Sequence, residues 1–496
     1  MSVPLQPSFD EFQALSSRGN LIAVWAELTA DYETPLSAFE KIADGAPRFL
    51  FESAETTGFS GRYSLMGAHP RAIITARGQE LEIVEGSERR TVQVNGDPLR
   101  EVERIMARYQ PVPQPQLPVF HGGAVGFLGY DMVRHFEPTV PPAPKDELGL
   151  PEMVFLIADS VVIFDHRYRL MQVVANVCLT DFPDARAAYH EAGRRIHEMI
   201  ERLSQPLHVK PMAAVPAPAP AAAVSNTTRE EYLGMVDKAK EYIRAGDIFQ
   251  VVPSQRFEVP YTGRPIELYR ALRHVNPSPY MFCLELGDFS LVGSSPEVHV
   301  RCMNGRVDIR PIAGTRWRGK TEAEDDALAA ELLADEKERA EHIMLVDLAR
   351  NDVGRVSTYG SVVVSDLMTI ERYSHVMHIV SNVHGTLAPD KTSYDVMRAT
   401  FPAGTVSGSP KVRAMQVINE LEKSKRCAYA GAVGYFGFDG NHDSCIALRT
   451  VVLTNGQAYV QAGAGIVADS VPESEYTETV NKAAAALRAV ERAARL

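Results

Sequence analysis

GAVGFLGYD, residues 123–131, returns as GAVGYFGFD at residues 431–439. The two stretches share their first four residues, their third glycine and their final aspartate, and both carry aromatic residues at the fifth and eighth positions. Glycines at this density let two sheets, or a sheet and a ligand, approach closely. The repeat therefore indicates two halves with related sheets, and we interpret the chain as a β-rich core with helices outside.

Hydrophobic periodicity around these stretches supports the mixed interpretation. Alternation of apolar and polar residues predicts strands, and a 3.6-residue period predicts helices. The predicted strands are RAIITAR (71–77), RTVQV (90–94), MVFLIADSVVIFDH (153–166), RLMQVVANVCL (169–179) and YSHVMHIVSNV (373–383). Helices are predicted at 184–203 and from a Ser or Asn cap at 225–226 to a stop at Gly246.

One segment differs from the rest in composition. KPMAAVPAPAPAAAVSN, residues 210–226, consists almost entirely of proline, alanine and valine. Such a stretch buries too little surface to fold and is typical of an extended tether. We therefore predict an N-terminal domain at 1–209, a linker at 210–226 and a C-terminal domain at 227–496.

Composition limits the kinds of partner. The 496 residues include 45% hydrophobic and 23% charged residues with a net charge of −12, which argues against nucleic acid. No basic segment precedes an apolar core at the N-terminus, and no apolar run is long enough to span a membrane. The five cysteines form no close pairs, so we expect neither a zinc site nor disulfides, and a cytoplasmic location.

Two glutamate pairs stand at the start of two helical runs. Glu338 and Glu341 are three residues apart in KERAEHIMLVDLARND (337–352), and Glu475 and Glu478 repeat this spacing in 473–496. Residues at i and i+3 share a helix face, so each pair could bind a cation, for which Mg²⁺ is the natural candidate. Glutamates also enrich first helical turns because they complement the helix dipole, and this explanation stays open.

Other features indicate a pocket for an anion. FPAGTVSGSPK (401–411) and QAGAGIVADS (461–470) are glycine-rich turns that offer backbone amides, and Arg449 lies in a strand-like run. His378 lies in a strand predicted to be buried on both faces, where a core role is more usual than catalysis, and His375 would face the opposite side. The residues alone indicate a magnesium enzyme with a small anionic substrate, without naming the reaction.

The motifs PIAGTRWRG, AEHIMLVDLARND, FPAGTVSGSPK, YAGAVGYFGF, IALRT and AGAGIVADSVPESEYTET resemble the chorismate-utilising enzymes, and among them the large subunits of anthranilate synthases. The resemblance covers about residues 230–490, in consistent order, and is weaker before them. It implies an α+β fold whose β-sandwich core has two large, mostly antiparallel sheets with helices packed outside.

The resemblance also implies an activity: chorismate and ammonia would give anthranilate and pyruvate, the first committed step of tryptophan synthesis. Glu341 and Glu478 would bind Mg²⁺ directly, and Glu338 and Glu475 through water. Glu297 would be the general acid for the departing hydroxyl, with His378 and Thr405 also in the catalytic site. The predicted substrate contacts are Tyr429, Arg449, Gly463, Gly465, Gln250, Ala313, Gly314 and Thr315.

Two positions distinguish the different enzymes within the family that this chain resembles. Aminodeoxychorismate synthases carry a nucleophilic lysine where this chain has Ala313, and isochorismate synthases carry a lysine base where it has Gln250. Ammonia therefore remains as the nucleophile, with anthranilate as the product. An aminodeoxyisochorismate synthase that stops before pyruvate elimination stays open as an alternative.

The resemblance further implies partners and regulation. No cysteine context resembles a glutaminase nucleophile, so a separate glutamine amidotransferase subunit would supply ammonia, as in a heterotetramer of two large and two small subunits. FLFESAE (49–55) and NPSPYMF (276–282) resemble the paired elements that bind tryptophan as feedback inhibitor. The predicted contacts are Glu52, Ser53, Asn276, Pro277, Ser278, Pro279, Tyr280 and Met281. The alternative for these two segments is a structural role only, as a strand edge followed by a proline turn. The alternative for the whole protein is a tryptophan sensor without catalytic activity.

Overall fold

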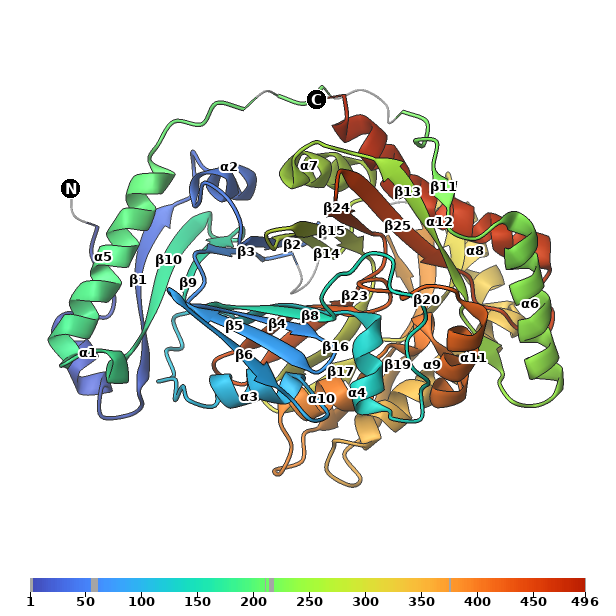
Figure 1. The fold of residues 1–496 in the computed structure, drawn as a ribbon, viewed down its shortest axis with the longest axis horizontal. Coiled ribbons are helices and arrows are strands. Elements are labelled where there is room, and N and C mark those ends of the chain that lie inside the picture. Colours follow the sequence, from blue (N-terminus) through green and yellow to red (C-terminus); the bar gives the residue numbers. More distant parts are fainter. Residues whose placement is uncertain (1–2, 55–60, 210, 214–217, 374–375, 496) are drawn as a thin grey trace.

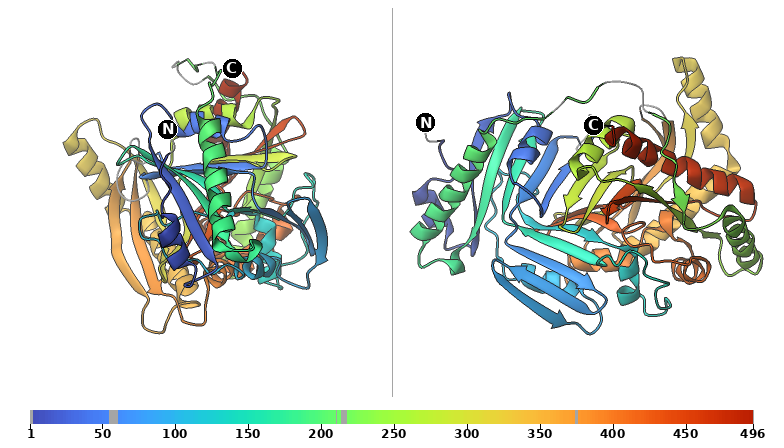
Figure 2. Two further views of the ribbon diagram at one scale, coloured as in Figure 1. Left: turned by 90° about the vertical axis from the view of Figure 1, so that its left-hand side faces the viewer. Right: turned by 45° about the horizontal axis from the view of Figure 1, so that its top comes forward.

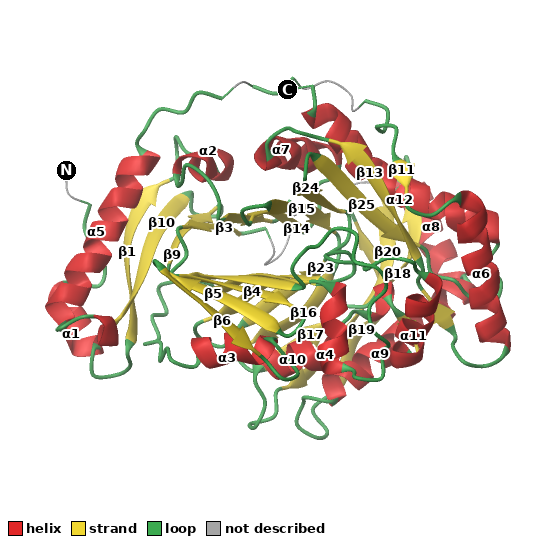
Figure 3. Ribbon diagram, viewed as in Figure 1, coloured by secondary structure: helices red, strands yellow, loops and turns green. Residues whose placement is uncertain are grey.

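The computed structural model of the protein describes residues 3–54, 61–209, 211–213, 218–373 and 376–495. Within these ranges the chain forms two large antiparallel sheets, a two-stranded ribbon and twelve α-helices (Figure 1). The helices lie at the periphery and the strands lie inside (Figure 3). This arrangement confirms the predicted α+β class with a β-sandwich core.

The first sheet, sheet A, has 11 strands and takes them from both halves of the chain. In spatial order they are β1 (Leu21–Thr29), β10 (Leu170–Cys178), β9 (Ser160–Asp165), β3 (Tyr63–Ala68), β2 (Arg48–Glu52), β14 (Tyr280–Glu285), β15 (Phe289–Ser295), β24 (Thr450–Thr454), β25 (Gln457–Gly463), β13 (Ser254–Pro260) and β11 (Val224–Ser225). The halves meet where β2 pairs with β14, with Phe51 opposite Phe282.

Sheet B has 12 strands and also crosses the two halves. In order they are β18 (Ile312–Trp317), β20 (Val376–Thr386), β17 (Arg306–Ile309), β16 (Val298–Met303), β23 (His442–Ile446), β22 (Ala432–Gly437), β7 (Gly123–Leu128), β8 (Met153–Ala158), β4 (Ala72–Arg77), β5 (Glu80–Glu85) and β6 (Glu88–Gln93), and β19 (Val363–Arg372) also pairs with β20. A short ribbon joins β12 (Gln250–Val251) to β21 (Gly408–Ser409).

The repeated nonapeptides are neighbours in this sheet. Strands β7 and β22 pair antiparallel, with Gly126 opposite Gly434. A Cβ atom at Gly126 would lie 1.9 Å from the carbonyl oxygen of Val154 on β8, and one at Gly434 would lie 2.1 Å from that of Asp443 on β23. Any side chain at either position would force the neighbouring strand away, so the glycines allow the close approach that the sequence predicted.

Helices cover the outer faces of both sheets. They are α1 (Phe9–Leu15), α2 (Pro35–Lys41), α3 (Leu99–Met106), α4 (Val133–Phe136), α5 (Ala185–Leu203), α6 (Arg229–Arg244), α7 (Pro265–Val275), α8 (Glu322–Ala334), α9 (Glu336–Gly354), α10 (Ser393–Thr400), α11 (Lys411–Leu421) and α12 (Pro472–Ala493), with 3-10 turns η1 (Tyr130–Met132), η2 (Leu179–Asp181) and η3 (Gly404–Val406). Figure 2 shows α1 and α5 on the side of the molecule away from α6 and α12.

Three apolar clusters form the layers between these elements. Phe49, Phe127 and Phe282 belong to the cluster between the two sheets, and each is at most 1% exposed. A second cluster joins sheet A to α5, α7 and α12, and a third joins sheet B to α3, α10 and α11. None of the described helices is both long and apolar enough to cross a bilayer.

The linker prediction falls partly outside the described residues, at 210 and 214–217. The described residues 211–213 and 218–223 are irregular and run across the top of Figure 1 toward β11. Met212, Ala221 and Ala223 pack against the helix-covered face of sheet A, so the tether buries more than its composition indicated. Because both sheets contain strands from each side, the domain boundaries at 209 and 227 stay a prediction.

Two local predictions are wrong. The cap of α6 is Thr228, whose hydroxyl accepts from the amide of Glu231 in a capping box, rather than Ser225 or Asn226. Strand β20 is not buried on both faces, since Val376, His378, Asn382 and His384 are only half-buried. Its less buried face carries His378, and His375 lies outside the described residues.

Candidate active site

A bulge in sheet B positions His378. The pairing of β18 with β20 shifts register between Ala313 and Arg316, and Gly314 adopts φ +66° inside the shift. This geometry aims the carbonyl oxygen of Gly314 at Nδ1 of His378, 2.8 Å away, with the Thr315 hydroxyl 3.1 Å from the same nitrogen. An Nδ1–H donor to this carbonyl leaves Nε2 as the free acceptor.

Burial also affects the protonation of His378. It lowers the pKa of the imidazole, the Gly314 carbonyl raises it, and the charge of Arg449 lowers it again. The histidine is therefore neutral at physiological pH and can accept a proton through Nε2.

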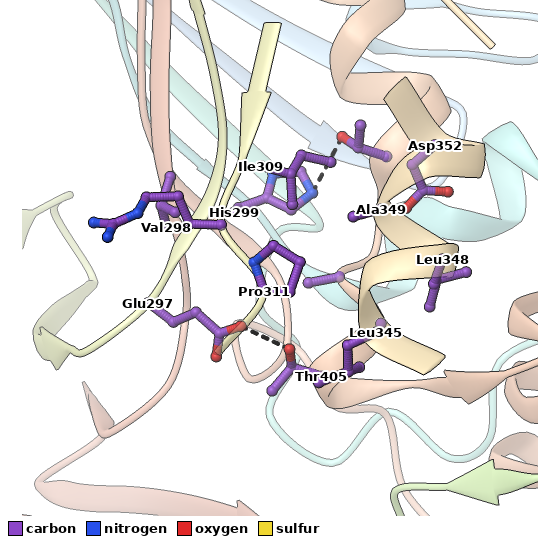
Figure 4. A pocket seen from close by; sticks show the side chains of 14 residues that line it. Glu297, Val298, His299, Ile309, Pro311, Leu345, Leu348, Ala349, Asp352 and Thr405 are labelled. Carbon is purple, nitrogen blue, oxygen red and sulfur yellow. Dashed lines mark hydrogen bonds between the residues drawn. The ribbon is translucent and has the colours of Figure 1, made fainter. Parts of the chain in front are cut away.

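Glu297 and Thr405 lie together at the edge of a small cavity. The hydroxyl of Thr405, from η3, donates to Oε1 of Glu297 over 2.7 Å. Figure 4 shows this bond on one side of a cavity of about 30 Å³, with Leu345, Leu348 and Ala349 of α9 on the other side. This volume holds about one water molecule.

The environment of Glu297 changes its acidity. The side chain is 8% exposed, and burial raises its pKa to about 7, although Thr405, Lys482 and Arg449 all lower it. A carboxyl group with this pKa is partly protonated at neutral pH, as a general acid requires. The influence of Arg449 and Lys482 also shows that both cations lie near this carboxyl group.

Arg449 lies directly before β24, with its side chain toward Asn276. The residue is exposed, yet the surrounding protein lowers the pKa of its guanidinium, and Glu297 partly restores it. Its backbone has φ +48°, in the left-handed region, and its Nη1 donates to Oδ1 of Asn276 over 3.3 Å. An exposed guanidinium can bind a carboxylate through two parallel N–H···O bonds.

The two predicted backbone contacts lie against Tyr429 and Gln250. A Cβ atom at Gly463 would lie 2.7 Å from the Pro253 carbonyl oxygen and 2.8 Å from the Tyr429 hydroxyl. One at Gly465 would lie 2.8 Å from Nε2 of Gln250. Tyr429 is buried, which raises its pKa to about 12, so its hydroxyl stays protonated as a donor. Both positions need glycine because Pro253, Tyr429 and Gln250 leave no room for a Cβ atom.

The glutamate pairs connect to the same site. Glu341 accepts from Nε2 of Gln250 over 3.1 Å, and Glu478 pairs with Lys482, whose Nζ also donates to the Gly463 carbonyl oxygen over 3.2 Å. A Cβ atom at Gly314 would lie 3.2 Å from Oε2 of Glu338. Glu475 is 9% exposed, and the charge of Lys337 on α9 partly offsets the burial that raises its pKa. The starts of α9 and α12 therefore face the turns that carry the other site residues.

The donor chemistry fits a cation. Burial and the charge of Glu341 raise the pKa of Glu338, while burial and Glu478 raise that of Glu475. A divalent ion between the pairs would stabilise these carboxylates, and Mg²⁺ needs only one or two of them directly. Within the described ranges, no three Asp, Glu, His or Cys side chains are grouped closely enough to form a complete ligand set. Magnesium stays a prediction.

The two segments predicted to bind tryptophan lie side by side. Glu52 is opposite Met281 in the pairing of β2 with β14, and the amide of Ala54 donates to the Ser278 carbonyl oxygen over 3.1 Å. Tyr269 of α7 donates to Glu52 over 2.6 Å, and Arg301 donates to the Tyr280 hydroxyl over 2.7 Å. Ser53, Pro277 and Pro279 belong to the same two segments, and their proposed ligand contacts stay a prediction.

Comparison with known proteins decides the family. The sequence model described as chorismate binding enzyme matches residues 46–488. The chain belongs to the chorismate binding enzymes.

Relatives of this chorismate binding enzyme match over nearly their full length. Anthranilate synthase component 1 of Acetivibrio thermocellus is 47% identical over 98% of this chain and 99% of its own length. Anthranilate synthase component 1 of Pseudomonas aeruginosa is 48% identical over 97% and 98%, respectively.

Solved structures of chorismate binding enzymes share the fold. Anthranilate synthase component I from Streptococcus pneumoniae superposes with a TM-score of 0.78 at 37% identity, covering 93% of this chain and 99% of that one. The menaquinone-specific isochorismate synthase of Escherichia coli has a TM-score of 0.70 at 18% identity, which speaks for the fold alone. The predicted family and sandwich fold are confirmed.

Sequence reasoning missed several residues that support the site in this chorismate binding enzyme. Arg426 and Glu422 form a buried pair, and Arg426 also donates to the carbonyl oxygens of Val406 and Val252. This pair ties η3, which carries Thr405, to the strand beside Gly463. Lys482 and Arg426 could both have been found as i+4 partners of a glutamate, Glu478 and Glu422, but the sequence does not show that Arg426 also binds the carbonyl oxygens of Val406 and Val252.

Proposed function

We propose that this protein is the large subunit of an anthranilate synthase, which converts chorismate and ammonia to anthranilate and pyruvate. The observation that carries the proposal is that the charge of Arg449 acts on both Glu297 and His378, in a chain with no lysine at position 250 or 313. Curated relatives at 47–48% identity over nearly the whole chain bear the name anthranilate synthase component 1.

In this mechanism each residue acts on one part of chorismate. Arg449, the Tyr429 hydroxyl and the backbone at Gly463 and Gly465 bind the enolpyruvyl carboxylate through charge-assisted hydrogen bonds. Glu297 gives its proton to the departing C4 hydroxyl, which leaves as water, while ammonia attacks C2. The raised pKa of Glu297 supplies a proton at neutral pH.

The later steps need a base near the ring. His378 is neutral because burial lowers its pKa, and its Nε2 is free to accept a proton. Loss of the C2 proton and elimination of pyruvate then restore aromaticity. Gln250 is bound to Glu341 and cannot deprotonate water, so hydroxide does not compete with ammonia at C2.

We propose that Mg²⁺ is the cofactor, held by Glu341 and Glu478, with Glu338 and Glu475 acting through water. The ion would neutralise the ring carboxylate of chorismate and orient the ring. Lys337 and Lys482 would help to keep Glu475 ionised, because their charges oppose the burial and the Glu478 charge that raise its pKa.

Ammonia is proposed to come from a partner glutamine amidotransferase subunit, in a cytoplasmic heterotetramer. All five cysteines are buried, and burial raises the pKa of the Cys302 thiol to about 11 and that of Cys427 to about 12. A glutaminase nucleophile needs a lowered thiol pKa and access to substrate. Tryptophan is proposed as the feedback inhibitor, bound between the end of β2 and residues 276–281.

The test is product formation by the purified chain. Incubation with chorismate, MgCl₂ and ammonium at alkaline pH is expected to yield anthranilate, followed by its fluorescence, with an equal amount of pyruvate. Omission of ammonium is the control and should give no anthranilate. Accumulation of an aminated intermediate without pyruvate would instead assign the protein as an aminodeoxyisochorismate synthase, and isochorismate would refute both.

A further inference from the structure

Arg449 is held in an unfavourable backbone conformation by its surroundings. Its φ of +48° is in the left-handed region, which costs a non-glycine residue about 1 kcal/mol. The amide of Ser294 donates to the Arg449 carbonyl oxygen over 3.2 Å, and the next residue, Thr450, pairs with Gly293. The backbone is therefore fixed from β15, but these bonds do not fix the long side chain.

Asn276 supplies the bond to the side chain. Its Oδ1 accepts from Nη1 of Arg449 over 3.3 Å, and its Nδ2 donates to the Ser294 hydroxyl over 3.2 Å. The Ser294 hydroxyl donates back to the Asn276 carbonyl oxygen. Asn276, Ser294 and Arg449 thus form a closed ring of hydrogen bonds, and Ser294 is fully buried.

This ring sets the orientation of the amide. Because the Ser294 hydroxyl contacts Nδ2, the oxygen of the Asn276 amide is turned toward the guanidinium. A neutral acceptor in this place orients Arg449 without cancelling its charge, so the full charge stays available to an incoming carboxylate.

Asn276 also ends a helix, α7, that contacts β2. It is the C-cap of α7, and its amide donates to the Leu272 carbonyl oxygen over 2.8 Å. The same helix carries Tyr269 and Arg273, which both contact Glu52 on β2. Helix α7 and its C-cap therefore contact both Glu52 and Arg449.

We propose that Asn276 is a positioning residue for chorismate, which acts through Arg449 by holding the guanidinium toward the substrate carboxylate. The inference rests on the proposed function and differs from the tryptophan contact predicted for this residue. A tryptophan contact alone would leave chorismate binding unchanged when tryptophan is absent, whereas a positioning residue affects it under that condition.

The experiment compares Asn276→Ala, Asn276→Asp and wild type in steady-state kinetics without tryptophan. Asn276→Ala should raise KM for chorismate about tenfold, because a hydrogen bond to a charged group is lost, and should change kcat less than about twofold. Asn276→Asp should raise KM further, since its carboxylate competes with the substrate for Arg449. Exposed His274→Ala, two residues earlier, is the matched control and should behave as wild type.

The outcomes separate the two proposals. Wild type that forms no anthranilate would overturn the proposed function before any variant is compared. If wild type is active and both Asn276 variants keep its KM, the positioning role is refuted and the proposed function stands. The aspartate variant keeps an acceptor for Arg449 and adds a charge beside the guanidinium, so an unchanged KM in this variant would show that residue 276 does not act on Arg449 and would refute the proposal even where the alanine variant is too unstable to assay.

Discussion

Glu297 combines burial with a single strong hydrogen bond, and this combination determines when it can act. Its pKa of about 7 means that the carboxyl loses its proton as pH rises through neutrality. We predict that kcat/KM for chorismate, measured at constant free ammonia, falls about tenfold per pH unit above pH 7. Holding free ammonia constant is essential, because its rising fraction would mask the loss of the acid.

Replacement of Glu297 by glutamine tests the same group through stability. Below pH 4.5 the wild-type carboxyl is protonated whether folded or unfolded, and between 4.5 and about 7 only the folded state keeps the proton. The wild type therefore loses stability across this window, by about 3 kcal/mol in total. Glu297→Gln should be inactive, yet have a higher Tm than wild type at pH 8 and an equal one at pH 4. A lower Tm at pH 8 would contradict the assignment.

The sequence could identify Glu297 and Arg449 as site residues, but not the pKa of the one or the hydrogen-bond partner of the other. The resemblance suggested Glu297, in GSSPEVHV at residues 293–300, as the general acid. The need for a raised pKa followed because hydroxide is a poor leaving group and must be protonated as it departs. The pKa itself depends on Thr405, more than a hundred residues away, and on burial by η3. The bond between Asn276 and Arg449 was equally unpredictable, since neither local spacing nor periodicity reports a contact across two strands.

At the scale of an element, the bulge in β18 positions His378, the proposed base, by means of one glycine. Gly314→Ala places a Cβ atom 3.0 Å from Leu332 and 3.2 Å from Oε2 of Glu338, at φ +66°. We predict that this change lowers kcat/KM at least tenfold, because it moves both the carbonyl that holds His378 and a carboxylate of the proposed Mg²⁺ site.

A second glycine provides the matched control. Gly305, between β16 and β17, has φ +76° but nothing within 4 Å of its Cβ position. Gly305→Ala should cost a similar 1 kcal/mol or so of backbone strain while leaving kcat/KM close to wild type. Equal activity losses in the two variants, measured beside their Tm values, would show that strain alone is responsible.

Elements were predictable where one local pattern was strong. The alternation in RAIITAR and the helical period in 184–203 gave β4 and α5 because burial of one face follows directly from period. The cap of α6 was misassigned, since Ser225, Asn226 and Thr228 are all suitable cap residues. Pairing of Ser225 with Phe257 in β11 and β13, which the sequence does not reveal, decides among them.

For the whole molecule, the repeated nonapeptide indicated related sheets but not that its two copies would pair. Composition placed a division near residue 215, and this division separates neither sheet. Strand β2 lies between β3 and β14, and β7 lies between β8 and β22. Each half alone would expose two strand edges and the apolar residues between the sheets, which is unfavourable for both solubility and folding.

Cleavage of the linker should therefore leave the molecule intact. With a protease site inserted between Pro218 and Ala221, the two fragments are expected to co-elute in size exclusion and to keep anthranilate synthesis near the uncut level. The pairings of β2 with β14 and of β7 with β22, together with Phe49, Phe127 and Phe282, hold them together. Each fragment expressed alone should be insoluble, because those edges and side chains lack their partners. Fragments that separate under native conditions, each folded, would instead establish 1–209 and 227–496 as independent domains.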